Sequence, residues 1–360
     1  MPAEPLYLDH AATTPLLPQA RAALAQGFDA WANPSSPHKP GRAARALLEG
    51  ARARVKAALA WEYEAVFTSG ASEALALAIG RAQVERAKVE RVLVSAVEHE
   101  AVLRPAGADA ARLPVDAHGL VDLAALAAVL AGGPRTLVCV QQVNSETGVI
   151  QPLADIAALV RAAGGILLAD AAQGAGKIAL PDADLIALSA HKFGGPIGIG
   201  ALLIRDFALL EAPGGQERGY RGGTENMPAA LAMAAALEAG AGWMVEARRL
   251  RDLLDGQLQA AGAEIIASAA PRCPTIGGYR MPGVSSAAQL IRFDSAGIAV
   301  SAGSACSSGS LRPSHVLSAM GLDAKAAGEV LRVSIGCETD EAAIARFIAA
   351  WRDIAGSARA

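Results

Sequence analysis

A lysine in the middle of the chain lies between an apolar stretch and a glycine-rich one. Lys192 follows Leu185-Ile-Ala-Leu-Ser-Ala-His and precedes Phe193-Gly-Gly-Pro-Ile-Gly-Ile-Gly. At the edge of a sheet, such a lysine would project its amine into a crevice, where an amine can form a Schiff base. An exposed loop lysine fits the same pattern, so Lys192 alone does not decide. The glycines do not form a dinucleotide-binding motif, because that motif opens a helix directly after the first strand.

An acid precedes this lysine at the end of another apolar stretch. Asp170 closes the apolar part of Leu167-Leu-Ala-Asp-Ala-Ala-Gln. A carboxylate in this place can pair with the protonated pyridine nitrogen of pyridoxal phosphate, whose ring then acts as an electron sink. An ordinary Asp that caps a turn is the alternative. The order of Asp170 and Lys192 favours the cofactor, because ligands bind outside the carboxyl ends of strands in α/β sheets.

A third stretch is suited to a phosphate group. Thr68-Ser-Gly-Ala-Ser-Glu-Ala runs from an apolar strand through small residues into a helical pattern. The free N–H groups and the dipole at such a helix start attract anions. Ser72 adds a hydroxyl, and it can cap the helix at the same time.

One cysteine lies among small polar residues. Cys306 is part of Val300-Ser-Ala-Gly-Ser-Ala-Cys-Ser-Ser-Gly-Ser, a composition that predicts a mobile, exposed loop. Cys139, in Leu137-Val-Cys-Val, is by contrast expected to be buried and inert. An exposed loop thiol indicates a chemical task for Cys306.

The surrounding elements predict an α/β fold. Apolar strands are expected at 64–68, 92–94, 136–140 and 165–169, with helices from Ser72 and near Glu100. This alternation is typical of a mostly parallel sheet with helices on both faces. A long alanine-rich helical region follows Thr224 and runs to about Ala261. We therefore expect a large cofactor-binding domain at 14–243 and a smaller α+β domain formed by 1–13 and 244–360, which carries the cysteine loop.

Composition excludes several classes of protein. The formal net charge of -3 gives no general basic field for nucleic acid or anionic lipid. The mean hydropathy is +0.31, yet the apolar runs are too short to cross a membrane. The start shows no secretory signal, so a cytoplasmic protein is expected. The 4 cysteines stand singly, which favours reduced thiols over disulfides or a metal site.

Taken in order, these stretches resemble the cysteine desulfurase family, which has the aminotransferase class V fold of the fold type I pyridoxal-phosphate-dependent transferases. The resemblance covers nearly the whole chain. The matching blocks are Tyr7-Leu-Asp-His-Ala-Ala-Thr-Thr-Pro, Asn33-Pro-Ser-Ser-Pro-His, Phe67-Thr-Ser-Gly-Ala-Ser-Glu, Val143-Asn-Ser-Glu-Thr-Gly, Asp170-Ala-Ala-Gln, Ser189-Ala-His-Lys, Glu217-Arg-Gly-Tyr-Arg-Gly-Gly-Thr, Gly303-Ser-Ala-Cys and Leu331-Arg-Val-Ser-Ile-Gly.

The resemblance implies a role for each matched residue. Lys192 would bind pyridoxal phosphate covalently and move protons, and Cys306 would accept the sulfur of L-cysteine as a persulfide. The other cofactor contacts would be Asp170 to the pyridine nitrogen, Gln173 to the ring oxygen, His99 stacked on the ring, and Ala71, Ser72, Ser189 and His191 on the phosphate, with Thr224 reaching in from a partner subunit. Arg332 would bind the substrate carboxylate, and Asn144 would orient substrate and cofactor.

The family also implies partners. We expect a homodimer that passes sulfur to an acceptor protein: an iron-sulfur cluster scaffold, a tRNA-thiolation protein or a sulfur carrier. A selenocysteine lyase or another class V aminotransferase stays open, because one fold serves several reactions. Plain transamination uses no loop thiol, so Cys306 argues against that reaction. A catalytically inactive binding subunit is also disfavoured, because the catalytic set is complete: Lys192, Asp170, Arg332 and Cys306.

The end of the chain predicts an amphipathic closing helix around Phe347-Ile-Ala-Ala-Trp-Arg-Asp-Ile-Ala, followed by Gly356-Ser-Ala-Arg-Ala. Those last residues would bury little apolar area against a partner. We therefore expect an acceptor protein to dock near the Cys306 loop.

Overall fold

The computed structural model describes residues 5–84, 87–303 and 314–357. Its strands are β1 (Leu6–Tyr7), β2 (Glu64–Thr68), β3 (Gln83–Val84), β4 (Ala87–Lys88), β5 (Arg91–Ser95), β6 (Ala111–Leu113), β7 (Thr136–Gln141), β8 (Ile166–Asp170), β9 (Leu185–Ser189), β10 (Gly200–Ile204), β11 (Glu264–Ile265), β12 (Ile276–Arg280), β13 (Ile298–Ala299) and β14 (Val330–Ser334).

The helices alternate with these strands in the first part of the chain. They are α1 (Pro18–Asp29), α2 (Lys39–Ala58), α3 (Ala71–Arg81), α4 (Glu100–Ala106), α5 (Leu123–Leu130), α6 (Leu153–Ala162), α7 (Met227–Glu238), α8 (Met244–Ala260), α9 (Ser286–Ser295), α10 (His315–Ala319), α11 (Ala324–Ala327) and α12 (Glu341–Ser357). Short 3-10 turns lie at Ala190–Lys192, Phe207–Leu209 and Glu217–Gly219.

A seven-stranded sheet in the order β2-β10-β9-β8-β7-β5-β6 forms the larger body. Its pairs are parallel except those that β10 makes with β2 and β9. The central strands β7, β8 and β9 are buried at every residue. Such continuous apolar strands are typical of a parallel sheet covered on both faces, and the expected α/β fold is confirmed.

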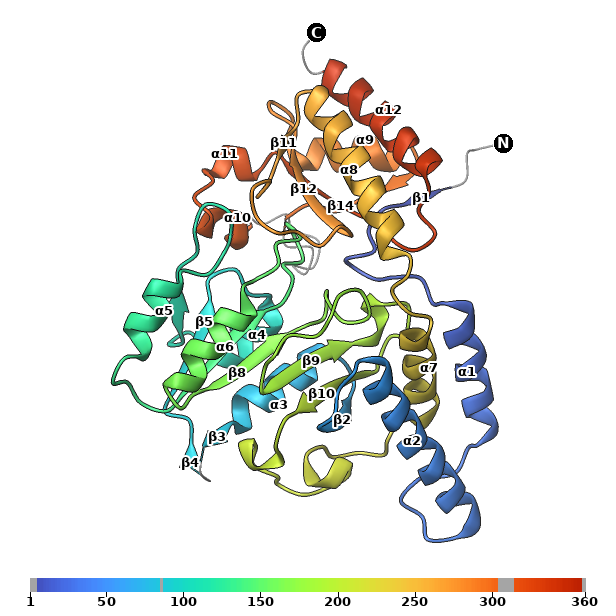
Figure 1. Cartoon of the computed structure of the whole chain (residues 1–360). Coiled ribbons are helices and arrows are strands. Elements are labelled where there is room, and N and C mark those ends of the chain that lie inside the picture. Colours follow the sequence, from blue (N-terminus) through green and yellow to red (C-terminus); the bar gives the residue numbers. More distant parts are fainter. Residues whose placement is uncertain (1–4, 85–86, 304–313, 358–360) are drawn as a thin grey trace.

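Alternate strand residues belong to two separate hydrophobic clusters. Leu167 and Ala169 of β8 pack in the cluster that includes residues of α1, α2, α5, α6 and α7. Ile166 and Leu168 pack in the other, with residues of α3 and α4. Because side chains alternate along a strand, this division means that helices cover both faces of the sheet (Figure 1).

A second body, drawn above the first in Figure 1, is built on the three-stranded antiparallel sheet β11-β12-β14. Its core contains residues of α8, α9 and α12, including the fully buried Trp351 and the stacked rings of Phe293 and Phe347. The expected amphipathic closing helix is present as α12. Leu8 also belongs to this core, and β1 pairs with β13, so the N-terminal residues pack there as expected.

The alanine-rich region after Thr224 is two helices rather than one. Helix α7 ends at Glu238 and α8 begins at Met244. Gly240 lies between them with φ of 77°, a conformation that interrupts a helix. Helix α7 packs against the large sheet, whereas α8 packs in the core of the small one. The domain boundaries themselves stay a prediction. No helix in the described part of the chain is long and apolar enough to span a membrane.

Candidate active site

A cavity of about 490 Å³ lies between the two bodies, at the ends of the parallel strands. It is lined by Ala11 and Ala12, by residues that follow β2, β5, β7, β8 and β9, and by Arg332 of β14. A cavity of this size accommodates a cofactor-sized ligand. The topology therefore brings amine, guanidinium, carboxyl and hydroxyl groups from separate elements to one pocket.

Lys192 and Asp170 enter this cavity from neighbouring strands. Strands β8 and β9 are parallel, Asp170 ends the first, and Lys192 lies in the 3-10 turn that follows the second. The Lys192 Nζ donates hydrogen bonds to the carbonyl oxygens of Ala11 at 2.7 Å and Ala12 at 2.9 Å. Burial raises the pKa of Asp170, while the hydrogen bond from the Ala172 N–H and the nearby Lys192 act against that rise.

A site suited to bind an anion lies beside Lys192 and Asp170. Helix α3 begins at Ala71 behind Gly70, and Ser72 is exposed in its first turn. Ser189 and His191, at the end of β9, line the same cavity as Ala71 and Ser72. Burial, with the charges of Lys192 and Lys177, lowers the pKa of His191 to about 4, so its ring is neutral at pH 7. These groups offer N–H and O–H donors to a phosphate.

Gln173 and His99 have fixed side-chain orientations. The Gln173 Nε2 donates to the carbonyl oxygen of Ala11 at 2.8 Å, and its Oε1 accepts from Lys177 Nζ at 3.4 Å. His99 is the N-cap of α4, where its Nδ1 accepts from the Ala101 N–H at 3.1 Å. In the neutral ring the proton is therefore on Nε2.

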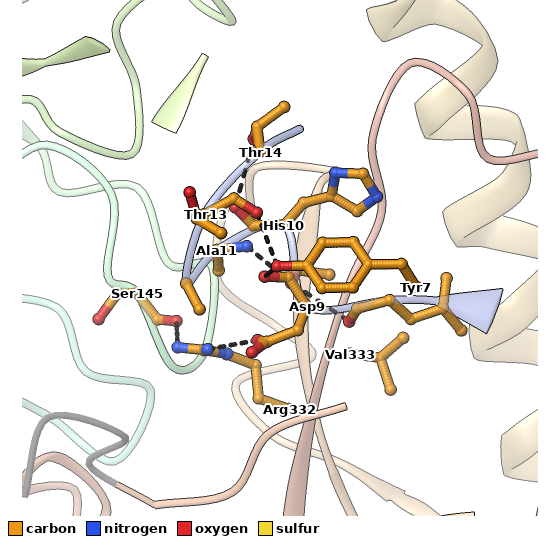
Figure 2. A network of polar contacts seen from close by, with 12 residues as sticks. Tyr7, Asp9, His10, Ala11, Thr13, Thr14, Ser145, Arg332 and Val333 are labelled. Atoms are coloured by element: carbon orange, nitrogen blue, oxygen red, sulfur yellow. Dashed lines mark hydrogen bonds and ion pairs between the residues drawn. The ribbon is translucent and has the colours of Figure 1, made fainter. Parts of the chain in front are cut away.

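Arg332 reaches the cavity from the small sheet. Figure 2 shows its guanidinium between Asp9 and Ser145: Nη2 lies 2.6 Å from Asp9 Oδ1, and Nη1 donates to the Ser145 carbonyl at 3.1 Å. Its Nε is buried and has no hydrogen-bond partner among the described residues. An arginine that is 6% exposed with one unused donor is suited to bind a carboxylate.

Two expected site residues do not line this cavity. The Asn144 Oδ1 accepts from the backbone N–H groups of Glu146 and Thr147, each at 2.9 Å, and its Nδ2 donates to Val97 at 3.2 Å. These bonds hold the turn after β7, and the expected contacts of Asn144 with substrate and cofactor stay a prediction. Thr224 is exposed and lies outside the cavity of its own chain.

Cys306 lies outside the described residues. Gly303, directly before that segment, and His315, which follows Ser314 after it, both line the cavity. The chain thus enters and leaves the segment at the cavity wall.

Three residues without an assignment from the sequence also belong to the site. Asp9 holds Arg332, and the carbonyl of Ala11 holds Lys192. Glu98 is fully buried, lines the cavity, and its Oε1 accepts from the Gln141 N–H at 2.9 Å. Burial raises the pKa of Glu98 to about 8, and the negative charge of Asp170 adds to this rise. Asp9 lies in a stretch that matched the family, directly before His10, and Glu98 directly precedes His99; these positions were the only signals for them.

The described residues contain no cluster of three or more His, Cys, Asp or Glu side chains that could hold a metal ion.

Comparisons with known proteins agree with this geometry. Residues 6–347 match the family model Aminotransferase class-V. A cysteine desulfurase from Cereibacter sphaeroides is 37% identical, over 99% of this chain and 97% of that protein. Among solved structures, a NifS-like protein from Rickettsia africae superposes with a TM-score of 0.88 at 29% identity, covering 98% of this chain and 99% of the other.

Another solved structure, SspA in complex with cysteine, superposes with a TM-score of 0.77 at 28% identity, covering 91% of this chain and 98% of that one. The fold, the cavity residues and the full-length identity lead to one conclusion. The chain belongs to the aminotransferase class V family, among its pyridoxal-phosphate-dependent cysteine desulfurases.

Proposed function

We propose that this cysteine desulfurase binds pyridoxal phosphate through Lys192, converts L-cysteine to L-alanine, and holds the released sulfur as a persulfide on Cys306. The observation that carries the proposal is the convergence of Lys192, Asp170 and Arg332 on one cavity, whose wall also contains Gly303 and His315 on either side of the cysteine segment.

The residues of the cavity fit the cofactor. Asp170 is a buried carboxylate that would hold a proton on the pyridine nitrogen, and burial of such a charge is favourable only with a positive partner. The start of α3, with Ser72, and the donors of Ser189 and His191 would bind the phosphate. When bound, pyridoxal phosphate supplies an electron sink for the bonds broken at the substrate.

Substrate binding would fall to Arg332. Its unpaired Nε and the adjacent Nη groups would bind the carboxylate of L-cysteine, while the ion pair with Asp9 holds the guanidinium at the cavity edge. The solved relative SspA in complex with cysteine supports this substrate. The substrate amine would displace Lys192, whose freed amine lies between the Ala11 and Ala12 carbonyls.

Lys192 would then move protons at the substrate α- and β-carbons. The thiolate of Cys306 attacks the substrate sulfur, and the bond between that sulfur and the β-carbon breaks with its electrons left on carbon. Protonation of the carbon skeleton gives L-alanine, and the enzyme keeps the sulfur as Cys306–S–SH. One thiol and one cysteine are consumed, and one alanine and one persulfide are formed.

One experiment tests the proposal. Purified protein is incubated with pyridoxal phosphate and L-cysteine, and alanine and protein-bound persulfide are measured with and without reductant. Alanine and persulfide in equal amounts are expected in the first turnover, and Cys306→Ala should form no persulfide. Pyruvate or a transaminated product in place of alanine would overturn the proposal.

We further propose a homodimer with shared sites. Thr224 is exposed and does not line the cavity of its own chain, which supports a role at the phosphate of the partner subunit. The segment before it is anchored by Glu217, whose carboxylate accepts from Arg52 at 2.7 Å and from the Phe67 N–H at 3.0 Å. Light scattering should give twice the chain mass, and a fully active monomer would contradict the shared site.

The sulfur acceptor is proposed to be a protein that docks at the mouth of the cavity near Cys306, either a cluster scaffold or a sulfur carrier. The working compartment is proposed to be the cytoplasm. Cys139, Cys273 and Cys337 are free thiols, and persulfide chemistry on Cys306 needs a reduced thiol.

A further inference from the structure

A second lysine lies behind the cavity. Lys177 is only 7% exposed, and its Nζ donates to the Gln173 Oε1 at 3.4 Å. It forms no ion pair with a carboxylate in the ranges 5–84, 87–303 and 314–357. A buried ammonium without an anionic partner is unfavourable, and burial accordingly lowers the pKa of Lys177.

The other titratable groups near Lys177 do not neutralise it. His10 and His191 both have a pKa lowered to about 4, mainly by burial; the charge of Lys177 adds to this at His10, and the charges of Lys192 and then Lys177 add to it at His191. At neutral pH these rings carry no charge. The thiol of Cys273 acts against burial and raises the pKa of Lys177. Within the part of the chain that the structure describes, no carboxylate pairs with the charge of Lys177.

The hydrogen bonds of Lys177 fix the neighbouring amide. Gln173 has an acceptor, the Ala11 carbonyl, at its nitrogen and a donor, Lys177, at its oxygen. Both neighbours require the same orientation of the amide, so Nε2 keeps one further N–H for the cavity that Gln173 lines. An ammonium on the amide oxygen also polarises the amide and strengthens that N–H as a donor.

We propose that Lys177 is a positioning residue for the ring oxygen of the bound cofactor. It acts through Gln173, by holding the amide so that Nε2 donates to this oxygen and by favouring the anionic form of the oxygen. This inference rests on the proposed function, because it takes pyridoxal phosphate as the occupant of the cavity. It assigns a task to a buried cation that the desulfuration steps themselves do not use.

The test is the absorption spectrum of the bound cofactor in the absence of L-cysteine. The yellow, long-wavelength form is the one with an anionic ring oxygen, and a form that absorbs at shorter wavelength has this oxygen protonated. Lys177→Met removes the ammonium and keeps the length of the side chain. The ratio of long- to short-wavelength absorbance is expected to fall by about threefold or more. Lys177→Arg, which keeps a cationic donor, should restore most of it, and a cavity of about 30 Å³ beside Lys177 gives the guanidinium room.

A double-mutant cycle separates this role from a merely structural one. If Lys177 acts through Gln173, then Lys177→Met should change the spectrum of a Gln173→Ala protein much less than that of the parent. The melting temperature of the cofactor-free Lys177→Met protein should be equal to or above that of the parent, because an unpaired buried charge has been removed. Identical spectra of a folded Lys177→Met protein and the parent would overturn the inference. If the parent itself does not turn yellow with pyridoxal phosphate, the proposed function fails instead.

Discussion

Lys192 and Gln173 donate to the same acceptor, the carbonyl oxygen of Ala11, at 2.7 Å and 2.8 Å. The amine that is proposed to bind the cofactor and the amide that is proposed to contact its ring oxygen are therefore placed by one backbone group. That group belongs to the N-terminal segment, residues 8–14, which is attached to the small sheet through the Ser334 N–H and the Leu8 carbonyl at 2.8 Å.

The first prediction concerns Lys192. Lys192→Ala removes the amine that binds the cofactor and moves protons, so alanine formation from L-cysteine should fall by roughly 1,000-fold or more. Borohydride should no longer attach the cofactor to the protein, as measured by mass spectrometry. Lys325→Ala, at an exposed lysine of α11, is the matched control and should keep full activity. Substantial alanine formation by Lys192→Ala would refute the assignment.

The second prediction concerns Arg332. A lysine in its place cannot contact Asp9, the Ser145 carbonyl and a substrate carboxylate at once, because it lacks the planar fork of arginine. Arg332→Lys should lower kcat/KM for L-cysteine by roughly 10- to 100-fold, mainly through KM.

Steady-state kinetics checks this, with Arg352→Lys on the exposed side of α12 as the control. Asp9→Asn should raise KM less, since an amide oxygen still accepts from Nη2. An unchanged KM for Arg332→Lys would show that the substrate carboxylate binds elsewhere.

The third prediction concerns Glu98 and pH. Burial raises its pKa to about 8 from the ordinary glutamate value of 4.5, so the folded protein keeps a proton that the unfolded chain loses. Its burial consequently lowers the free energy of unfolding progressively from about pH 4.5 to pH 8, by up to about 1.4 kcal/mol per pH unit. Below that range the carboxyl is neutral in both states. Above it the carboxyl is ionised in both states, and the free energy of unfolding falls no further on its account.

Glu98→Gln removes this titration and keeps an acceptor for the Gln141 N–H. Urea unfolding at several pH values should show the variant gaining stability over the parent as the pH rises from 5 to 8, with no further gain above. A constant difference at all pH values would mean that Glu98 titrates normally.

The fourth prediction concerns the anchor of the segment that leads to Thr224. Arg52 and Glu217 form a buried ion pair at 2.7 Å, and Glu217 and Arg218 have positive φ values of 48° and 58°. Glu217→Gln leaves the buried guanidinium with less charge compensation and should lower the free energy of unfolding by about 3 kcal/mol.

The exposed pair of Arg54 and Glu238, at 2.6 Å, offers the matched control. Glu238→Gln should change the free energy of unfolding by less than about 1 kcal/mol. Equal effects of Glu217→Gln and Glu238→Gln in urea unfolding would show that burial of the first pair is irrelevant.

Much of the fold class could be predicted from the sequence because the positions of several strands and helices follow from local patterns. The apolar run ending at Asp170 and the one before Lys192 are neighbouring parallel strands, as expected. The predicted phosphate-binding residues Ala71 and Ser72 lie at the start of α3. Cys139 is buried, as its apolar neighbours indicate. Each of these depends on a few consecutive residues and on the rule that parallel strands end at one edge of a sheet.

The rest of the site depends on contacts between distant residues. The carbonyls that hold Lys192 belong to Ala11 and Ala12, and a backbone oxygen leaves no mark in a sequence. Asp9 meets Arg332 across 323 positions of the chain. Nothing in the alanine-rich pattern near Lys177 indicates that its amine donates a hydrogen bond to the Gln173 Oε1. Asn144 was matched to the family by its neighbours, whereas its hydrogen bonds are decided by the turn that it closes.

The N-terminal segment crosses from one body of the protein to the other. Leu8 packs in the core of the small sheet, the Ala11 and Ala12 carbonyls hold Lys192, and the Thr14 N–H donates to the His191 carbonyl at 2.8 Å. Any displacement of the small sheet away from the large one pulls on the same few peptide units that hold the amine. The position of the small sheet and the position of the amine are therefore linked through one short stretch of backbone, without any side chain of the catalytic set.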